Sequence, residues 1–268
     1  MKINRKVEGA GGREEERRKG RSGESFPPSR NAPRRSAQAA WNDLNTQIVA
    51  CERCPRLRQY CLQVAAAKKA AHLHEDYWGR PAPNFGDPLG RILIVGLAPA
   101  AHGANRTGRL FTGDKSGDYL YRALHAVGLA NQPTAVAIDD GLELRDCAIT
   151  DVNHCAPPEN KPTTEEIANC REWMTRTLEI IPVRVFVPLG GIAWTAVVRE
   201  LKAFGYVSGK LPKFGHGAVA DLADGKKLLG CYHPSQRNTF TGRLTHEMLV
   251  EIFRRAQRLA GPTRTVGK

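Results

Sequence analysis

The chain of 268 residues lacks several features that would place it in a broad class of protein. No apolar run approaches the length of a membrane span, and no signal-peptide core follows the first residue. Seven cysteines is an odd number, which does not suit a disulfide framework. No internal repeat is evident either. These absences favour a globular protein of the reducing cytoplasm.

The first 40 residues have almost no large apolar side chains, so burial cannot offset their chain entropy. They hold 11 Lys and Arg against 5 Asp and Glu, which leaves 29 against 22 in the remainder, from an overall charge of +13. We expect a disordered basic tail over residues 1–40, one domain over 41–260 and a flexible C-terminus over 261–268. The tail is either a solubilising extension or an arm for nucleic acid. The domain is basic in its own right, which favours a polyanionic partner.

Short apolar runs alternate with helical patterns along the domain. We predict strands at residues 91–95, 146–150, 183–187 and 227–231, and helices at 41–71, 118–127, 164–180, 192–204 and 245–259. This alternation is typical of an α/β fold, here three layers with a central, mainly parallel, four-stranded sheet. Ligands of such folds bind beyond the carboxyl ends of the strands. The segments that follow the predicted strands are rich in Gly, Pro and polar residues.

Four of the cysteines form a split pattern, Cys51-x2-Cys54 and Cys155-x14-Cys170. Four thiolates suit either a tetrahedral zinc ion or an iron–sulfur cubane, and the spacing alone does not choose between them. Ordinary buried cysteines are the third alternative, since a free Cys behaves as a small apolar side chain.

Two further motifs follow predicted strands. Residues 96–117 combine repeated Gly and Pro with polar side chains, as in a rigid loop whose backbone amides approach a ligand. The segment has neither the Walker spacing nor the G-x-G-x-x-G of dinucleotide folds. The polar side chains Asn105, Arg106 and Arg109 favour a site over a plain surface loop. The second motif, His233-Pro-Ser235, places a histidine at the same edge of the sheet.

Taken in order, these motifs resemble the uracil-DNA glycosylase superfamily, and within it the family-five, type-B branch of iron–sulfur enzymes. The motifs are Cys51-x2-Cys54, Gly96-Leu-Ala-Pro-Ala, Arg106-Thr-Gly-Arg109-x-Phe111-Thr-Gly-Asp114, Cys155-Ala-Pro-Pro-x-Asn-Lys-Pro, Cys170 and His233-Pro-Ser235. The resemblance covers about residues 45 to 257. It implies a [4Fe–4S] cluster on Cys51, Cys54, Cys155 and Cys170.

The resemblance also implies a reaction: hydrolysis of the N-glycosidic bond of uracil in DNA, after the base has been flipped out of the duplex. The enzyme would be a monofunctional monomer that acts in base excision repair, in a bacterial cytoplasm and in association with the nucleoid. The implied partner is DNA with uracil or other deaminated bases, and no membrane is involved. A non-catalytic iron–sulfur protein that binds DNA or senses damage is the alternative, and a zinc-bound structural or nuclease-like protein is another.

The resemblance assigns roles to single residues. At the position after the glycine that matches Gly96, the wider superfamily has a polar catalytic side chain, whereas the type-B branch has an apolar one. This chain has Leu97 there, followed by Ala98. Asp114 matches the catalytic carboxylate of the type-B branch, and His233 would stabilise the departing base. Phe111 matches the aromatic ring that stacks on the base. In the His-Pro-Ser turn, Ser235 is expected to contact the DNA, and so are Arg237 and Asn238, which follow the turn.

One position departs from the pattern. Related enzymes commonly read the base edge with an Asn four residues before the third cysteine, where this chain has Asp151. A carboxylate cannot donate a hydrogen bond to uracil O4 unless it is protonated. Either Asn153 takes this role through a shifted register, or the pocket accepts a broader set of bases, such as hypoxanthine and xanthine.

Overall fold

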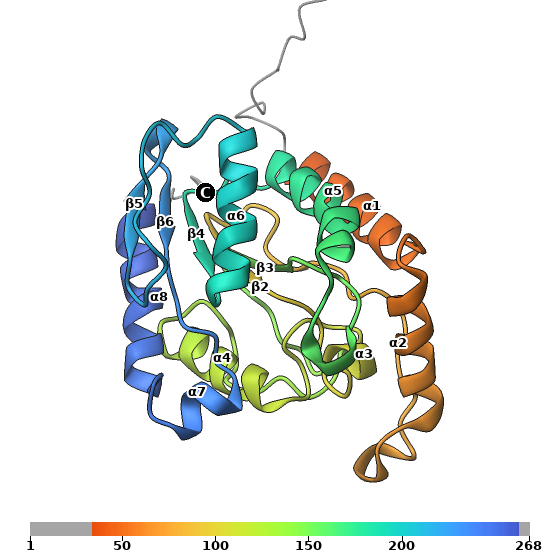
Figure 1. The fold of residues 1–268 in the computed structure, drawn as a ribbon. Coiled ribbons are helices and arrows are strands. Elements are labelled where there is room, and N and C mark those ends of the chain that lie inside the picture. Colours follow the sequence, from red (N-terminus) through yellow and green to blue (C-terminus); the bar gives the residue numbers. More distant parts are fainter. Residues whose placement is uncertain (1–33, 263–268) are drawn as a thin grey trace, which may run out of the picture.

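A computed structural model of the chain describes residues 34–262 and contains a six-stranded sheet between two layers of helices (Figure 1). The strand order is β1-β3-β2-β4-β6-β5. The inner strands are parallel: β3 (Cys147–Asp151), β2 (Ile92–Gly96), β4 (Val185–Pro188) and β6 (Lys227–Leu229). The edge strands β1 (Phe85–Gly86) and β5 (Val219–Asp221) are antiparallel to their neighbours.

The predicted α/β fold and its mainly parallel sheet are confirmed. All four predicted strands are present as the inner strands, and the prediction missed the two at the edges. These have only two and three residues, which is too short for an alternating pattern to stand out from a loop.

Helices cover both faces of the sheet. Alternate residues of β2 show why, because Ile92 and Ile94 pack into one apolar cluster while Leu93 and Val95 pack into the other. The first cluster includes α4 (Lys115–Ala126) and α8 (His246–Ala260). The second includes residues of α1 (Arg34–Val49), α5 (Thr164–Ile180) and α6 (Gly191–Ala203). The three-layer prediction is therefore confirmed.

The predicted single helix over residues 41–71 is wrong. Helix α1 ends at Val49, and α2 (Pro55–Ala67) begins after a turn. Pro55 is the first residue of α2, where its missing N–H costs nothing, but the ring would clash in an uninterrupted helix. The turn between the two helices therefore carries Cys51 and Cys54.

The predicted domain boundary at residue 40 also lies too late, because α1 already begins at Arg34. The remainder of the predicted tail, and most of the predicted flexible C-terminus, lie outside the described residues. None of the helices in the described range is long and apolar enough to cross a membrane.

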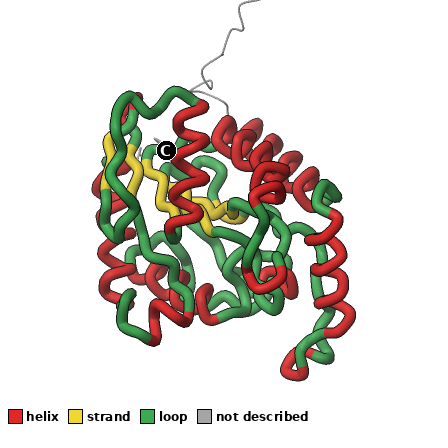
Figure 2. The backbone as a smooth tube through the Cα atoms, in the orientation of Figure 1, coloured by secondary structure: helices red, strands yellow, loops and turns green. Residues whose placement is uncertain are grey.

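The remaining short helices lie in the segments that connect the longer elements. They are α3 (Ala104–Thr107), α7 (Gln236–Phe240) and the 3₁₀ turns η1 (Ala70–His72), η2 (Pro158–Asn160) and η3 (Ala223–Gly225). Figure 2 shows long loop segments gathered at one end of the sheet, together with α3 and α7. This is the end where the parallel strands β2 and β3 finish, and it is where the site residues are found.

Candidate active site

The floor of the site is formed where β2 and β3 end side by side. Gly96 pairs with Asp151 across the two strands. A Cβ atom on Gly96 would lie 2.1 Å from Asp151 Oδ1 and 2.8 Å from the Phe111 ring, so only glycine fits there. Asp151 and Phe111 therefore both pack against the backbone at Gly96.

Phe111 is held in an unusual backbone conformation. Its φ is 54°, in the left-handed region that is costly for a bulky side chain and that is concentrated at functional sites. The ring lies next to that of His233, with centroids 6.0 Å apart and planes at 35°. Burial lowers the pKa of His233 to about 4, so at neutral pH its imidazole is uncharged. An aromatic ring and a neutral imidazole thus lie together beside Gly96.

Asp114 is the N-cap of α4. Its Oδ1 accepts a hydrogen bond of 2.9 Å from the Gly117 amide, and its Oδ2 packs against Gly103. Burial raises the pKa of Asp114, and the amides of Gly117 and Ser116 oppose that rise. A carboxylate at a helix N-terminus is stabilised by the orphan N–H groups and by the helix dipole. Asp114 is therefore a fixed, partly desolvated acid at the end of the loop.

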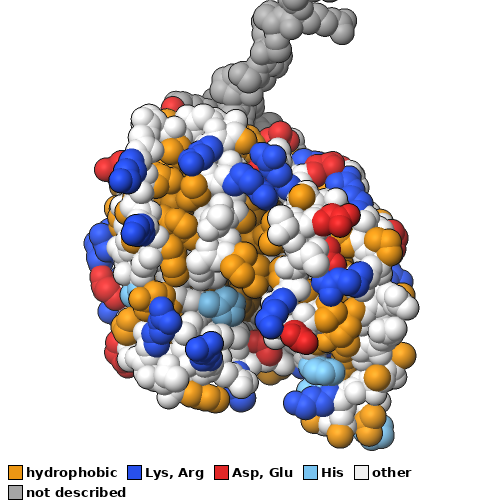
Figure 3. Space-filling model, viewed as in Figure 1, with side chains coloured by type: hydrophobic (Ala, Val, Ile, Leu, Met, Phe, Trp, Pro, Cys, Tyr) orange, Lys and Arg blue, Asp and Glu red, His pale blue; other side chains and the backbone are white. Residues whose placement is uncertain are grey.

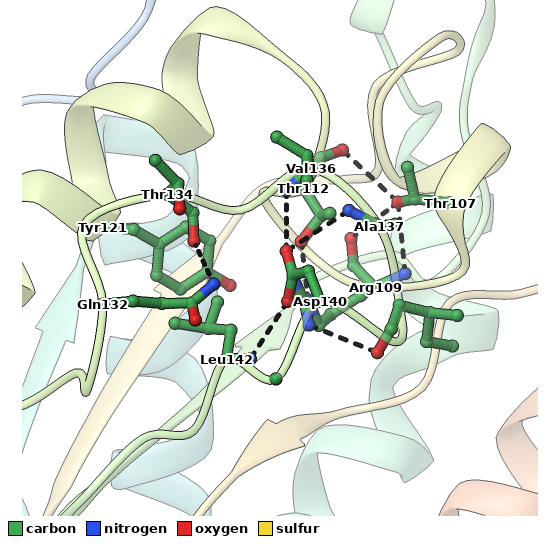
Figure 4. A network of polar contacts seen from close by, with 12 residues as sticks. Thr107, Arg109, Thr112, Tyr121, Gln132, Thr134, Val136, Ala137, Asp140 and Leu142 are labelled. Atoms are coloured by element: carbon green, nitrogen blue, oxygen red, sulfur yellow. Dashed lines mark hydrogen bonds and ion pairs between the residues drawn. The ribbon is translucent and has the colours of Figure 1, made fainter.

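A buried polar network fixes the conformation of this loop (Figure 4). The Arg109 guanidinium donates to Thr112 Oγ1 at 2.8 Å and to Asp140 Oδ2 at 2.7 Å. Asp140 also accepts from the backbone amides of Val136 and Leu142. Because Thr112 follows Phe111 directly, this network supports the strained residue at the centre of the site.

Asp140→Asn is expected to lower the free energy of unfolding by about 2 kcal/mol at neutral pH. Although burial raises the pKa of Asp140, the hydrogen bonds from Arg109 and the backbone amides lower it from 3.8 to about 2. A depressed pKa stabilises the fold above the ordinary value, and this stabilisation disappears as pH falls through about 2. Urea unfolding of both proteins at neutral and acidic pH measures the difference. Asp139→Asn, at the exposed neighbouring position, is the control, and an equal loss there would contradict the prediction.

The four cysteines of the split pattern line one cavity, which is the second feature of this part of the molecule. Cys51 and Cys54 reach it from the turn before α2, Cys155 from the loop after β3, and Cys170 from α5. All are free thiols. Leu57, Pro81 and Trp173 supply apolar walls. Residues far apart in the sequence are thus gathered around one space.

Backbone and side-chain N–H groups point at the sulfur atoms of this cavity. The His154 amide donates to Cys170 Sγ at 3.4 Å, and Asn169 Nδ2 donates to Cys54 Sγ at 3.8 Å. Burial raises the pKa of the Cys170 thiol to about 12, so this group needs a compensating cation to become a thiolate. Within residues 34–262, no group of three or more His, Cys, Asp or Glu side chains is arranged to hold a metal ion.

Comparisons with known proteins identify the family of the chain. Residues 83–257 match the family model described as the uracil DNA glycosylase superfamily. The chain belongs to this superfamily. It is 51% identical over 221 residues to a type-5 uracil-DNA glycosylase of Mycobacterium leprae, covering 82% of this chain and 95% of the relative. The type-5 enzyme of Thermus thermophilus is 49% identical over 215 residues, covering 80% and 95%.

More distant relatives belong to another branch. A type-4 uracil-DNA glycosylase of Thermotoga maritima is 32% identical over 146 residues, which is 54% of this chain and 65% of the relative. The higher identity and coverage of the type-5 relatives place this superfamily member in family five.

Asp151 and Asn153, the two residues considered for reading the base edge, lie in different parts of the structure. Asp151 lies at the floor of the active site beside Gly96. Asn153 lies on the other side, where it lines the cysteine cavity and donates from Nδ2 to the Glu166 carbonyl at 3.0 Å. The structure therefore does not bring Asn153 together with Phe111, and the shifted-register hypothesis finds no support in this geometry.

The residues after His233 form the start of α7. Ser235 is the N-cap without a side-chain capping bond, and the Arg237 side chain is exposed. Asn238 instead donates from Nδ2 to the His233 carbonyl at 2.9 Å, which holds the turn that carries the histidine. Ala98 lies partly exposed in the loop that follows Gly96.

Some of the polar residues singled out in the glycine-rich segment brace the loop from inside. Asn105, Arg106 and Arg109 are 1%, 7% and 4% exposed. Arg106 donates to the His102 and Gly113 carbonyls at 2.9 and 3.0 Å and also pairs with Glu75. Their density favoured a site at this loop, and the structure shows that these side chains shape the loop from within.

Glu166 was missed by the sequence analysis. It completes a capping box with Thr163 at the start of α5 and accepts two hydrogen bonds of 2.7 Å from Arg56 of α2. This pair ties the helix that carries Cys170 to the helix that follows Cys54. The Thr-x-x-Glu pattern before a helix is a signal that could have revealed its cap, but not its Arg56 partner.

Proposed function

We propose that the protein is a monofunctional DNA glycosylase that hydrolyses the N-glycosidic bond of uracil in DNA and leaves an abasic site for base excision repair. The observation that carries the proposal is the arrangement of Asp151 and Phe111 against Gly96, with His233 beside the Phe111 ring and Asp114 against Gly103, in a chain of this superfamily. No lyase step is included, because Lys115, which follows Asp114, has an exposed side chain that pairs with Asp118.

The chemistry follows from the bond that breaks. Cleavage passes through an oxocarbenium-like state, which a nearby carboxylate stabilises. Asp114 supplies that negative charge and can orient or activate the attacking water. Neutral His233 has one N–H to donate toward the negative charge that develops on the departing base. Phe111 offers the flipped base a stacking surface, which helps to offset the few kcal/mol that flipping costs.

The proposed substrate, DNA, is a polyanion, so the protein needs positive charge to bind it. Figure 3 shows Lys and Arg side chains distributed over the face that it presents, including the part over α7. The chain has a net charge of +13. We therefore propose duplex or single-stranded DNA as the partner, bound by a monomer and with an affinity that falls as salt rises. We propose a cytoplasmic location, where the DNA lies and where seven unpaired cysteines remain reduced.

We propose that Cys51, Cys54, Cys155 and Cys170 hold a [4Fe–4S] cluster. The support is their shared cavity, its apolar walls and the N–H groups aimed at two of the sulfurs, all of which are typical of cluster sites. When bound, the cluster would hold the turn before α2, the loop after β3 and helix α5 together.

Incubation of the protein with uracil-containing duplexes, followed by alkali, is the test. We expect strand breaks only where uracil stood, because alkali cleaves the abasic sites that a glycosylase leaves. Hypoxanthine and xanthine duplexes test the wider range of bases that Asp151 suggests. A matched duplex with thymine at the same position is the control. The absence of cleavage by a cluster-replete sample would refute the enzyme proposal.

A further inference from the structure

Asp151 is a buried carboxyl group without hydrogen-bond donors. The residue is 2% exposed, and its Oδ1 is fully shielded and has no hydrogen-bond partner among residues 34–262. It lies against the Gly96 backbone and beside Phe111, at the floor of the active site. A buried ionised carboxylate without donors is costly, and the usual outcome is that the group takes up a proton.

The charged groups around Asp151 also favour its protonated form. Burial raises the pKa of Asp151 well above 3.8, and the negative charge of Asp114 raises it further. Cys170 on α5 is close enough to interact electrostatically with it and adds no positive charge. On β2, the residue that pairs with Asp151 is Gly96, which has no side chain to offer a charge. The segment that follows β2 contributes the Phe111 ring.

The two carboxyl groups of the site have contrasting surroundings. Asp114 accepts hydrogen bonds from the Gly117 and Ser116 amides at the start of a helix, whereas no donor reaches the shielded Oδ1 of Asp151. When two acids interact, the one with donors holds the charge and the other keeps the proton. The environments therefore assign the negative charge to Asp114 and the proton to Asp151.

A neutral carboxyl group has an O–H donor and a C=O acceptor side by side. Uracil presents a matching edge, with O4 as an acceptor next to N3–H as a donor. We propose that Asp151 reads the flipped base as a carboxylic acid, donating its O–H to O4 and accepting from N3–H. This inference rests on the proposed function, because it gives the selectivity of the same site.

The hydrogen-bond pattern has a consequence for substrate range. Hypoxanthine and xanthine carry a carbonyl next to a ring N–H, just as uracil does, so the Asp151 carboxyl group accepts all three edges. Discrimination among them then falls to the size of the pocket. Asp151 is thus a specificity-determining residue, and the bond-breaking step remains with Asp114.

Single-turnover release of uracil across a range of pH tests the inference. The raised pKa of Asp151 means that its O–H is present below that pKa and lost above it, so release by the native protein should fall as pH rises through it. Asp151→Asn keeps a donor and an acceptor but cannot lose a proton, so its release should not show this fall. Asp151→Leu, which has neither group, should release uracil about 10- to 100-fold more slowly. Parallel pH profiles for the native protein and Asp151→Asn would overturn the inference.

Infrared spectra of the free protein separate this inference from the proposed function. At neutral pH, the C=O band of a neutral carboxylic acid should be present in the native protein and absent from Asp151→Asn. A missing band would overturn the role of Asp151 even if uracil is released. Failure of the native protein to release uracil at any pH would overturn the proposed function, whatever the infrared result.

Discussion

Asp114→Asn is expected to slow uracil release by about 10²- to 10⁴-fold, the range that a positioned acid or base contributes. The change removes the negative charge that would stabilise the oxocarbenium-like state. It keeps the shape of the side chain and an oxygen that can accept from the Gly117 amide, so α4 should remain capped. Single-turnover release from a uracil duplex measures the loss, and salt-dependent DNA binding should be retained.

Asp118→Asn is the matched control for this change. Asp118 is also in the first turn of α4, but it pairs with Lys115 at the surface and has a half-exposed side chain. Its replacement should leave the rate of uracil release nearly unchanged. If Asp114→Asn releases uracil as fast as the native protein, Asp114 has no part in the mechanism. An equal loss in both variants would instead indicate that only the general charge of this region matters.

Cys170→Ser is expected to remove the visible colour of the protein, lower its iron and sulfide content, and reduce stability by more than about 4 kcal/mol, as loss of a metal site can. The physical reason is that Cys170 is the proposed ligand from α5, which the cluster would join to the turn before α2 and to the loop after β3. Iron and sulfide analysis, together with urea unfolding, measures the effect.

Cys147→Ala is the control for the cysteine change. Cys147 is equally buried but lies in β3, within the apolar cluster under α4 and away from the cavity. We expect it to cost some packing energy while the iron content stays that of the native protein. A colourless native protein that contains zinc would refute the cluster. Equal loss of iron in both variants would refute the assignment of Cys170.

The segment from Asp151 to Cys155 links the two sites of the molecule. Asp151 faces the active-site floor, Asn153 bonds to α5, and Cys155 reaches the cysteine cavity. A cluster that fixes Cys155 would therefore also fix the end of β3, from which Asp151 projects. In the arrangement that we propose, the iron would serve as a scaffold, and the chemistry would belong to the side chains of Asp114 and His233.

Several features of the site were predictable from the sequence because they depend on local patterns. The runs that became β2, β3, β4 and β6 are short and apolar, and parallel strands place the segments beyond their carboxyl ends at one edge. The helix predicted from the sequence begins only at residue 118, so the N-cap role of Asp114 was missed, although an Asp before a helical segment can satisfy its first amides. The ordered motifs also indicated the family that the comparisons confirm.

Other features depend on contacts between distant parts of the chain, which no local pattern contains. Only the folded structure separates Asp151, which packs against Gly96, from Asn153, which donates to the Glu166 carbonyl of α5. The folded structure also shows that polar residues of the glycine-rich loop stabilise it by bonding to partners as distant in sequence as Asp140.

By itself, the sequence determined the α/β class and the family and supplied the candidate site residues, since these follow from periodicity and motif order. The tertiary structure decided which of those residues meet. It gathered four cysteines around one cavity, and it placed two acids with contrasting hydrogen bonding against two glycines, Asp151 at Gly96 and Asp114 at Gly103. Burial and the supply of hydrogen-bond donors set the charge of each acid, and both arise only when the chain is folded.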